Sequence, residues 1–165
     1  MKRFFFTLLA LCTGILADAQ TRTYTDNANG TYVFGLDSYF YGESGSLTFE
    51  ADGRSFQATV SPEAVTLGGQ RLGGGGDVVI GIHDFTGNHV PEFVMAVRTS
   101  GSIGVWIYAF QAGRWSPLKM MSVRDAKEVR IFRQVLSIRR GEVLSSWTYH
   151  DGKFDYKASD GSVEP

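Results

Sequence analysis

Residues 102–110, SIGVWIYAF, decide the fold class because both sides of this stretch are apolar. Successive side chains of a β-strand point to opposite faces of the sheet. One face would carry Trp106, Tyr108 and Phe110, and the other would carry Ile103, Val105, Ile107 and Ala109. Such a strand is expected in a sheet that is covered on both sides. The stretches DVVIGI (77–82) and FVMAV (93–97) have the same character.

Tight turns separate these apolar stretches from others. Asp52-Gly53 lies between SLTF and SFQATV, and Asp151-Gly152 lies between VLSSWTY and FDYKA. Asp-Gly between apolar runs indicates a hairpin, because both central residues of a type I′ turn need positive φ. Convincing helical periodicity is absent; the best candidates are one turn at Ser61–Thr66 and a weaker one at Val123–Lys127. The predicted strands are 31–36, 46–50, 54–60, 77–83, 92–99, 102–110, 114–118, 128–138, 142–149 and 153–158.

This pattern predicts one all-β domain over residues 20–165. An antiparallel meander of hairpins forming a sandwich, a partial barrel or propeller-like blades would satisfy it. The glycines at 73–76 predict a flexible loop between two halves, since no phosphate-loop Lys-Ser/Thr and no helix follow them.

The N-terminus predicts export. Lys2 and Arg3 precede an apolar run, and Ala17-Asp18-Ala19 is typical of a cleavage site, so residues 1–19 are interpreted as a secretory signal peptide. Cys12 follows an apolar run as in a lipoprotein signal, but the residue before it is the large Leu11. Cleavage after Ala19 removes this single cysteine and leaves no disulfide. Export without disulfides favours a bacterial periplasmic or secreted protein.

Charge and hydropathy exclude two classes of partner. The chain has 16 Lys and Arg against 17 Asp and Glu, and without residues 1–19 these become 14 and 16. This balance offers no basic excess to attract nucleic acid. After the signal peptide, no hydrophobic run approaches the length of a transmembrane segment.

One polar stretch, DFTGNHVPEF (84–93), has the spacing of a calcium-binding loop. Calcium takes six to eight oxygen ligands, which alternate residues of a tight loop can supply. The candidate ligands are the side chains of Asp84, Thr86, Asn88 and Glu92 and the carbonyl oxygen of Val90. The alternative is a structural turn, in which Asp84 and Asn88 hydrogen-bond their own loop backbone.

This stretch resembles the FG-GAP/VCBS repeat of integrin-type β-propellers. That family has an Asp-rich calcium loop, then Pro-Asp or Pro-Glu, then a buried strand, and the resemblance covers about residues 77–118 in one degenerate copy. It implies a blade-like sheet and a calcium site. The chain departs from the family pattern at Thr86, where an acid or amide is usual, and at His89, where glycine is usual. Two carboxylates imply weak binding.

Other polar residues indicate little catalytic chemistry. His83 and Asp84 are adjacent, so in a strand they would point to opposite faces. The acids Glu43, Glu50, Glu63 and Glu92 are scattered, and the sequence alone does not pair them for glycan or peptide hydrolysis. Catalytic residues are therefore not assigned.

The aromatic run Tyr39-Phe40-Tyr41 is a candidate ligand contact, because consecutive aromatic side chains cannot all face one core. The alternative is that the adjoining sheet buries two of the three. The sequence favours an exported non-catalytic binding or structural module whose partner is a protein or a glycan. An envelope hydrolase that uses carboxylates and a weakly calcium-binding module are the alternatives.

Overall fold

A computed structural model of the chain describes residues 20–23, 31–34, 45–73, 77–99 and 101–158. These residues form fourteen β-strands without a helix, which confirms the predicted all-β class. Accordingly, the described residues include no helix that is long and apolar enough to cross a membrane.

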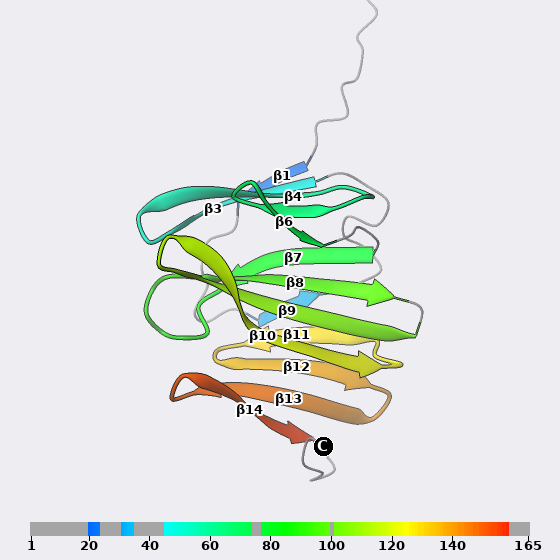
Figure 1. The fold of residues 1–165 in the computed structure, drawn as a ribbon. Helices are drawn as coiled ribbons and strands as arrows, with labels where there is room; N and C mark the ends of the chain where they lie inside the picture. Colours follow the sequence, from blue (N-terminus) through cyan, green and yellow to red (C-terminus); the bar gives the residue numbers. More distant parts are fainter. Residues whose placement is uncertain (1–19, 24–30, 35–44, 74–76, 100, 159–165) are drawn as a thin grey trace, which may run out of the picture.

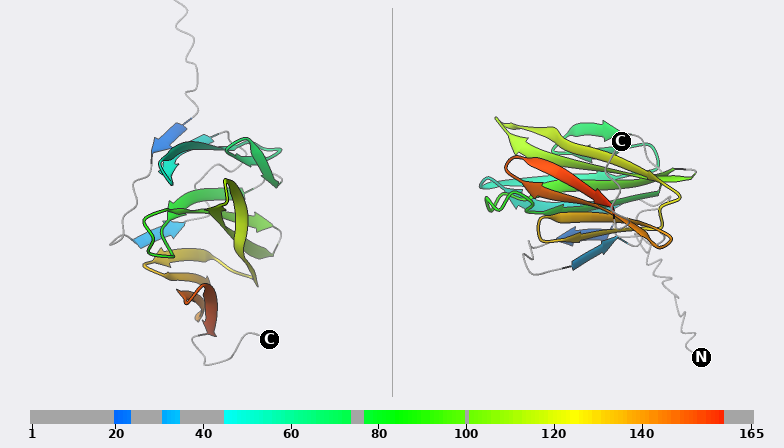
Figure 2. Two further views of the ribbon diagram at one scale, coloured as in Figure 1. Left: turned by 60° about the vertical axis from the view of Figure 1, so that its left-hand side comes forward. Right: turned by 90° about the horizontal axis from the view of Figure 1, so that it is seen from below.

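The strands form three sheets that are stacked face to face (Figures 1 and 2). The first sheet consists of β1 (Gln20–Thr23), β3 (Gly45–Ala51), β4 (Arg54–Val60), β5 (Val65–Leu67) and β6 (Gln70–Gly73). The middle sheet consists of β7 (Asp77–His83), β8 (Glu92–Thr99), β9 (Ser102–Gln111) and β10 (Arg114–Arg124). The third sheet consists of β2 (Thr31–Phe34), β11 (Glu128–Phe132), β12 (Val135–Arg140), β13 (Val143–His150) and β14 (Lys153–Ala158).

Each sheet is built on four consecutive strands joined as an antiparallel meander. Two short N-terminal strands extend the outer two sheets. Strand β1 pairs in parallel with β3, and β2 pairs in antiparallel with β11. The chain therefore forms three blade-like meanders of four strands in sequence order, and β2 departs from this order by joining the third sheet.

Tight turns set the register of the hairpins. Asp52 and Gly53 have φ values of 51° and 66°, and Asp151 and Gly152 have φ values of 48° and 84°. Positive φ at both central residues is the type I′ geometry predicted from the Asp-Gly pairs. Ala112-Gly113 forms a turn of the same kind, with φ values of 51° and 79°, and β9 continues through Gln111, one residue beyond the predicted strand 102–110.

The middle sheet is buried on both faces, as residues 102–110 predict. Tyr108 faces the first sheet and contributes to one core, and Val105 faces the third sheet and contributes to the other. The first core combines Leu47, Phe49, Val60 and Leu67 of the first sheet with Ile80, Phe93, Met95, Tyr108 and Trp115 of the middle sheet. The second core combines Val94, Val105, Ile107 and Met121 of the middle sheet with Val129, Ile131, Leu136, Ile138 and Trp147 of the third.

Three sequence predictions of local structure are wrong. Residues 128–138 are not one strand, because Arg133 adopts a φ of 51° and the chain turns between β11 and β12. Residues 61–66 do not form a helical turn; hydrogen bonds between Ser61 and Ala64 close a short turn and Val65 begins β5. The weaker helical candidate at 123–127 instead contains the end of β10.

The structure also gives strands that the sequence did not predict. Strands β1, β5 and β6 are absent from the prediction, and β10 extends six residues beyond its predicted end at residue 118. Gly73 ends β6, so it belongs to a strand rather than to a loop. Residues 1–19, the aromatic run at 39–41 and Gly74–Gly76 lie outside the described residues.

We expect Gly104→Ala to destabilise the middle sheet by about 1–3 kcal/mol, because overpacking forces neighbours to move. A Cβ atom at Gly104 would lie 2.6 Å from Cη2 of Trp106. Urea unfolding of Gly104→Ala, Trp106→Leu and the double variant measures this clash. The double variant should be more stable than the sum of the two single effects predicts, whereas additive effects would contradict the contact.

Candidate functional site

The candidate loop, residues 84–91, joins β7 to β8 in the first hairpin of the middle sheet. The corresponding connections in the other two sheets, 52–53 and 133–134, have two residues each. Among these three connections, only that of the middle sheet is long. Its two ends belong to β7 and β8, which are buried strands.

Asp84 organises the loop by accepting hydrogen bonds from the backbone that follows it. Its Oδ1 atom accepts from the N–H of Gly87 at 2.7 Å and of Asn88 at 3.3 Å. Its Oδ2 atom accepts from the N–H of His89 at 2.8 Å. Asn88 continues the pattern, since its Oδ1 accepts from the N–H of Val90 at 2.8 Å. These contacts are the local backbone bonds expected for a structural turn.

Two residues of the loop lie in the left-handed region of φ. Gly87 has a φ of 73°, and His89 has a φ of 65°. This conformation costs a residue with a Cβ atom about 1–2 kcal/mol. Glycine would adopt the same conformation at position 89 without this cost.

Glu92, the first residue of β8, stabilises the loop through a side-chain hydrogen bond. Its side chain is buried, with 2% of its surface exposed. Its Oε2 atom accepts from the N–H of Phe85 at 2.8 Å. A buried carboxylate is tolerated only with such partners, because burial removes its hydration. Phe85, fully buried in the second core, fixes the same end of the loop through its ring.

Three side-chain oxygens meet at Thr86. Its hydroxyl oxygen lies 3.3 Å from Oδ1 of Asp84 and 3.2 Å from Oε1 of Glu92. A hydroxyl has one hydrogen and cannot donate fully to both carboxylates. Either a proton on Glu92 or a cation among the three oxygens would relieve this competition.

Burial raises the pKa of Glu92 from its ordinary value of 4.5 to about 7. The nearby charge of Asp84 raises the pKa further, while the hydrogen bonds from Phe85 and Thr86 lower it. The pKa of Glu92 therefore lies near neutrality.

His83 has a separate, structural contact. Its Nε2 donates a hydrogen bond to the carbonyl oxygen of Arg133, in the turn between β11 and β12. Its ring packs edge-on against Phe85 with centroids 4.7 Å apart. His83 thus connects the end of β7 to the third sheet, while the carboxylate of Asp84 bonds to its own loop.

The structure brings together part of the predicted metal set. Asp84, Thr86 and Glu92 converge, whereas the Asn88 amide oxygen accepts a hydrogen bond from the Val90 N–H. No group of three His, Cys, Asp or Glu side chains in the described part of the chain is arranged to hold a metal.

The acids considered for hydrolysis lie on different elements. Glu50 is exposed on β3, Glu63 is exposed in the turn before β5, and Glu92 is buried in β8. Glu43 and the candidate ligand contacts Tyr39, Phe40 and Tyr41 are outside the described residues. Sequence reasoning did not identify Phe85, Gly87 and His89, whose N–H groups bind the two acids; the polar loop spacing gives no direct signal of backbone donors.

Comparisons with known proteins add no relative. A scan against protein-family models gave no match, and searches of curated proteins and of solved structures gave no significant similarity. The FG-GAP resemblance thus stays a prediction.

We expect the stability of the protein to fall as pH rises through the pKa of Glu92. The folded chain holds this proton more tightly than the unfolded chain, so the stabilisation is complete below about pH 4.5 and lost above about pH 7. Glu92→Gln keeps an acceptor for the Phe85 N–H and removes the titration. Since one pKa unit corresponds to about 1.4 kcal/mol, wild type should lose about 1–3 kcal/mol more than the variant between pH 5 and pH 8.

Urea unfolding at the two pH values measures this difference. Glu50→Gln is the matched control, because Glu50 is exposed on a strand of the first sheet. An equal loss in wild type and Glu92→Gln would contradict the account of Glu92.

His89→Gly should stabilise the protein by about 0.5–1 kcal/mol. Glycine removes the cost of the left-handed conformation, and its greater freedom in the unfolded chain offsets part of the gain. Thermal unfolding measures the effect, with His150→Gly as the control at an exposed histidine in a strand. A fall in stability on His89→Gly, similar to that of the control, would show that the backbone is not strained at His89.

Proposed function

We propose that the chain is an exported, non-catalytic β-module of the bacterial envelope or secretome that acts by binding a partner or as a structural component. The observation that supports this most directly is the use of the loop acids. Asp84 and Glu92 accept hydrogen bonds from the N–H groups of Gly87, His89 and Phe85, and these bonds close the connection between β7 and β8. Acids that are committed to their own backbone stabilise a fold.

The runner-up, an envelope hydrolase, would depend on Glu92. A pKa near 7 suits a general acid, but only 2% of the side chain is exposed and a substrate would have to displace the loop to reach it. Export itself is proposed from residues 1–19, with cleavage after Ala19.

A panel of chromogenic glycosides, esters and peptides tests the non-catalytic proposal. We expect no turnover above the rate measured with Glu92→Gln. Turnover that disappears in a folded Glu92→Gln variant would overturn the proposal in favour of the hydrolase. A glycan array and a pull-down from envelope extracts then identify the class of partner.

The second candidate function is weak calcium binding, which the convergence of oxygens at Thr86 favours. Asp84, Thr86 and Glu92 are the residues that would hold the ion, and carboxylate and hydroxyl oxygens are the donors that calcium prefers. Three oxygens fall short of the usual six to eight, so the affinity would be low. The FG-GAP resemblance of residues 77–118 agrees with this candidate.

We expect about 5–10 mM calcium to raise the melting temperature relative to chelator, because a ligand of the native state alone stabilises it. The rise should be larger at pH 8 than at pH 6, since Glu92 must lose its proton to bind a cation. It should disappear in Asp84→Ala and in Glu92→Gln.

Magnesium at the same concentration controls for ionic strength, and Asp155→Asn controls for the loss of an exposed acid. Asp84→Ala also removes loop hydrogen bonds, so the quantity compared is the calcium-dependent shift within each variant. Superimposed curves with calcium and with chelator at pH 8 would refute calcium binding at this concentration.

A further inference from the structure

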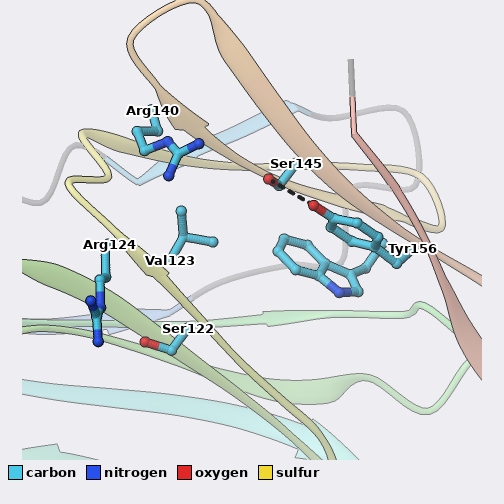
Figure 3. Close-up of a pocket in the computed structure, with 7 residues that line it drawn as sticks. Ser122, Val123, Arg124, Arg140, Ser145 and Tyr156 are labelled. Atoms are coloured by element: carbon cyan, nitrogen blue, oxygen red, sulfur yellow. Dashed lines mark hydrogen bonds between the residues drawn. The ribbon is translucent and has the colours of Figure 1, made fainter. Parts of the chain in front are cut away.

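A pocket opens between the middle and third sheets, where β10, β12, β13 and β14 come together (Figure 3). Its volume is about 340 Å³, within the range of small-molecule sites. It lies away from the 84–91 loop in sequence and is lined by different residues. The described lining residues are Ser122, Val123, Arg124, Arg140, Ser145, Trp147 and Tyr156.

Strand alternation explains why there is space at this point. On β13, Ser145 and Trp147 face inward, and the strand register places Ser145 between Ile138 of β12 and Ala158 of β14. Two small side chains, Ser145 and Ala158, thus stand in an inward-facing row where larger apolar residues would fill the layer. Ser145 is 8% exposed.

Two hydroxyl groups in the wall of the pocket make only a long hydrogen bond to each other. The hydroxyl oxygens of Ser145 and Tyr156 lie 3.4 Å apart, beyond the usual 2.5–3.0 Å of an O–H···O hydrogen bond. Figure 3 shows these hydroxyls facing each other across from Val123 of β10. Both can therefore donate to another acceptor, while Val123 and the ring of Trp147 supply apolar wall.

Arg140 gives the pocket its charge. Arg140 lies two residues after the inward-facing Ile138, so β12 continues its inward-facing row with a guanidinium. Arg124 ends β10 and borders the pocket, but it alternates with Val123 along the strand, and Figure 3 shows its guanidinium pointing away from Arg140. Arg140 is exposed, and the described residues provide it with no ion-pair partner.

Two other basic residues of the third sheet have a carboxylate partner. Arg130 pairs with Glu128, and Lys153 pairs with Asp155. No carboxylate is among the described residues that line the pocket. Donors and positive charge thus gather at a concave site without an internal acid, and a guanidinium matches the planar oxygens of carboxylates and phosphates.

We propose that this pocket binds a small organic oxyanion, with its carboxylate or phosphate group at Arg140 and its apolar body against Val123 and Trp147. The hydroxyls of Ser145 and Tyr156 donate to the remaining acceptors of the ligand. The inference deepens the proposed function as a binding module and rests on it, but it is independent of calcium binding at the 84–91 loop.

Titration of the mature chain with phenylacetate and with phenyl phosphate, followed by NMR of the tryptophan side chains, tests the proposal. The chain has three tryptophans, and only Trp147 is among the described lining residues. Trp106 and Trp115 pack in the first core, on the opposite face of the middle sheet. Saturable shifts of the Trp147 indole signal alone are expected, and the tighter of the two ligands identifies the preferred oxyanion.

Two further compounds measure separately what the charged group and the apolar ring of the ligand contribute to binding. Benzyl alcohol has the ring without the charge, and inorganic phosphate has the charge without the ring. Each should bind at least about tenfold more weakly than the better aromatic acid, because each lacks one set of contacts. Equal binding of benzyl alcohol would overturn the role of Arg140.

Arg140→Gln should weaken binding about 10- to 100-fold, which is the usual effect of losing a charged hydrogen bond. Arg139→Gln is the matched control, because Arg139 precedes Arg140 in β12 and faces the opposite side of the sheet. The affinity of this variant for the ligand should stay within about twofold of wild type. Ser145→Leu fills the pocket and should abolish binding if the variant folds. Unchanged affinity in Arg140→Gln, or no shift of Trp147 with either acid, would refute the pocket.

The same NMR samples separate this inference from the proposed function. Binding of phenyl phosphate without release of phenol supports both. Release of phenol that requires Arg140 would keep the oxyanion site and overturn the non-catalytic proposal. Absence of binding together with absence of turnover would overturn the oxyanion site alone.

Discussion

The burial of both faces of the middle sheet is the constraint on which the rest of the structure depends. Strands β7 to β9 expose almost no apolar surface because the first sheet covers one face and the third sheet covers the other. Removing either outer sheet would expose a full layer of Val, Ile and aromatic side chains. The three sheets must therefore be stable together, and any functional site attached to the middle sheet has a rigid support.

The candidate loop illustrates what such a support makes possible. Its ends belong to β7 and β8, and the Phe85 ring and the Glu92 carboxylate hold its base within the second core and the sheet. A buried acid is stable there only because backbone N–H groups and a threonine hydroxyl surround it. The same arrangement leaves the acid sensitive to pH and places three oxygens around one point, so the structural role and the proposed binding of a cation would depend on the same contacts.

The sequence predicted the features that have a strong local cause. Alternation in 102–110 gave both faces of β9 correctly, and the Asp-Gly pairs gave two type I′ turns. It failed where a turn has no glycine or proline, as at Arg133, and where a strand is only three residues long, as at β5. In the candidate loop, the sequence identified the two acids but not the backbone N–H groups that donate to them. The sequence also did not predict the pocket between the middle and third sheets. The inward-facing Ser145 was a signal, but sequence alone does not bring β10 alongside β13.

Hydrogen exchange of the native protein, measured residue by residue, tests the central position of the middle sheet most directly. Amides in β8 and β9 should exchange only through global unfolding, and the Phe85 amide should belong to the same slow class because it donates to buried Glu92. Strands β3, β4 and β14 of the outer sheets should exchange faster. Exchange of β8 and β9 at the rate of the outer sheets, or faster, would contradict the account of a middle sheet that both cores depend on.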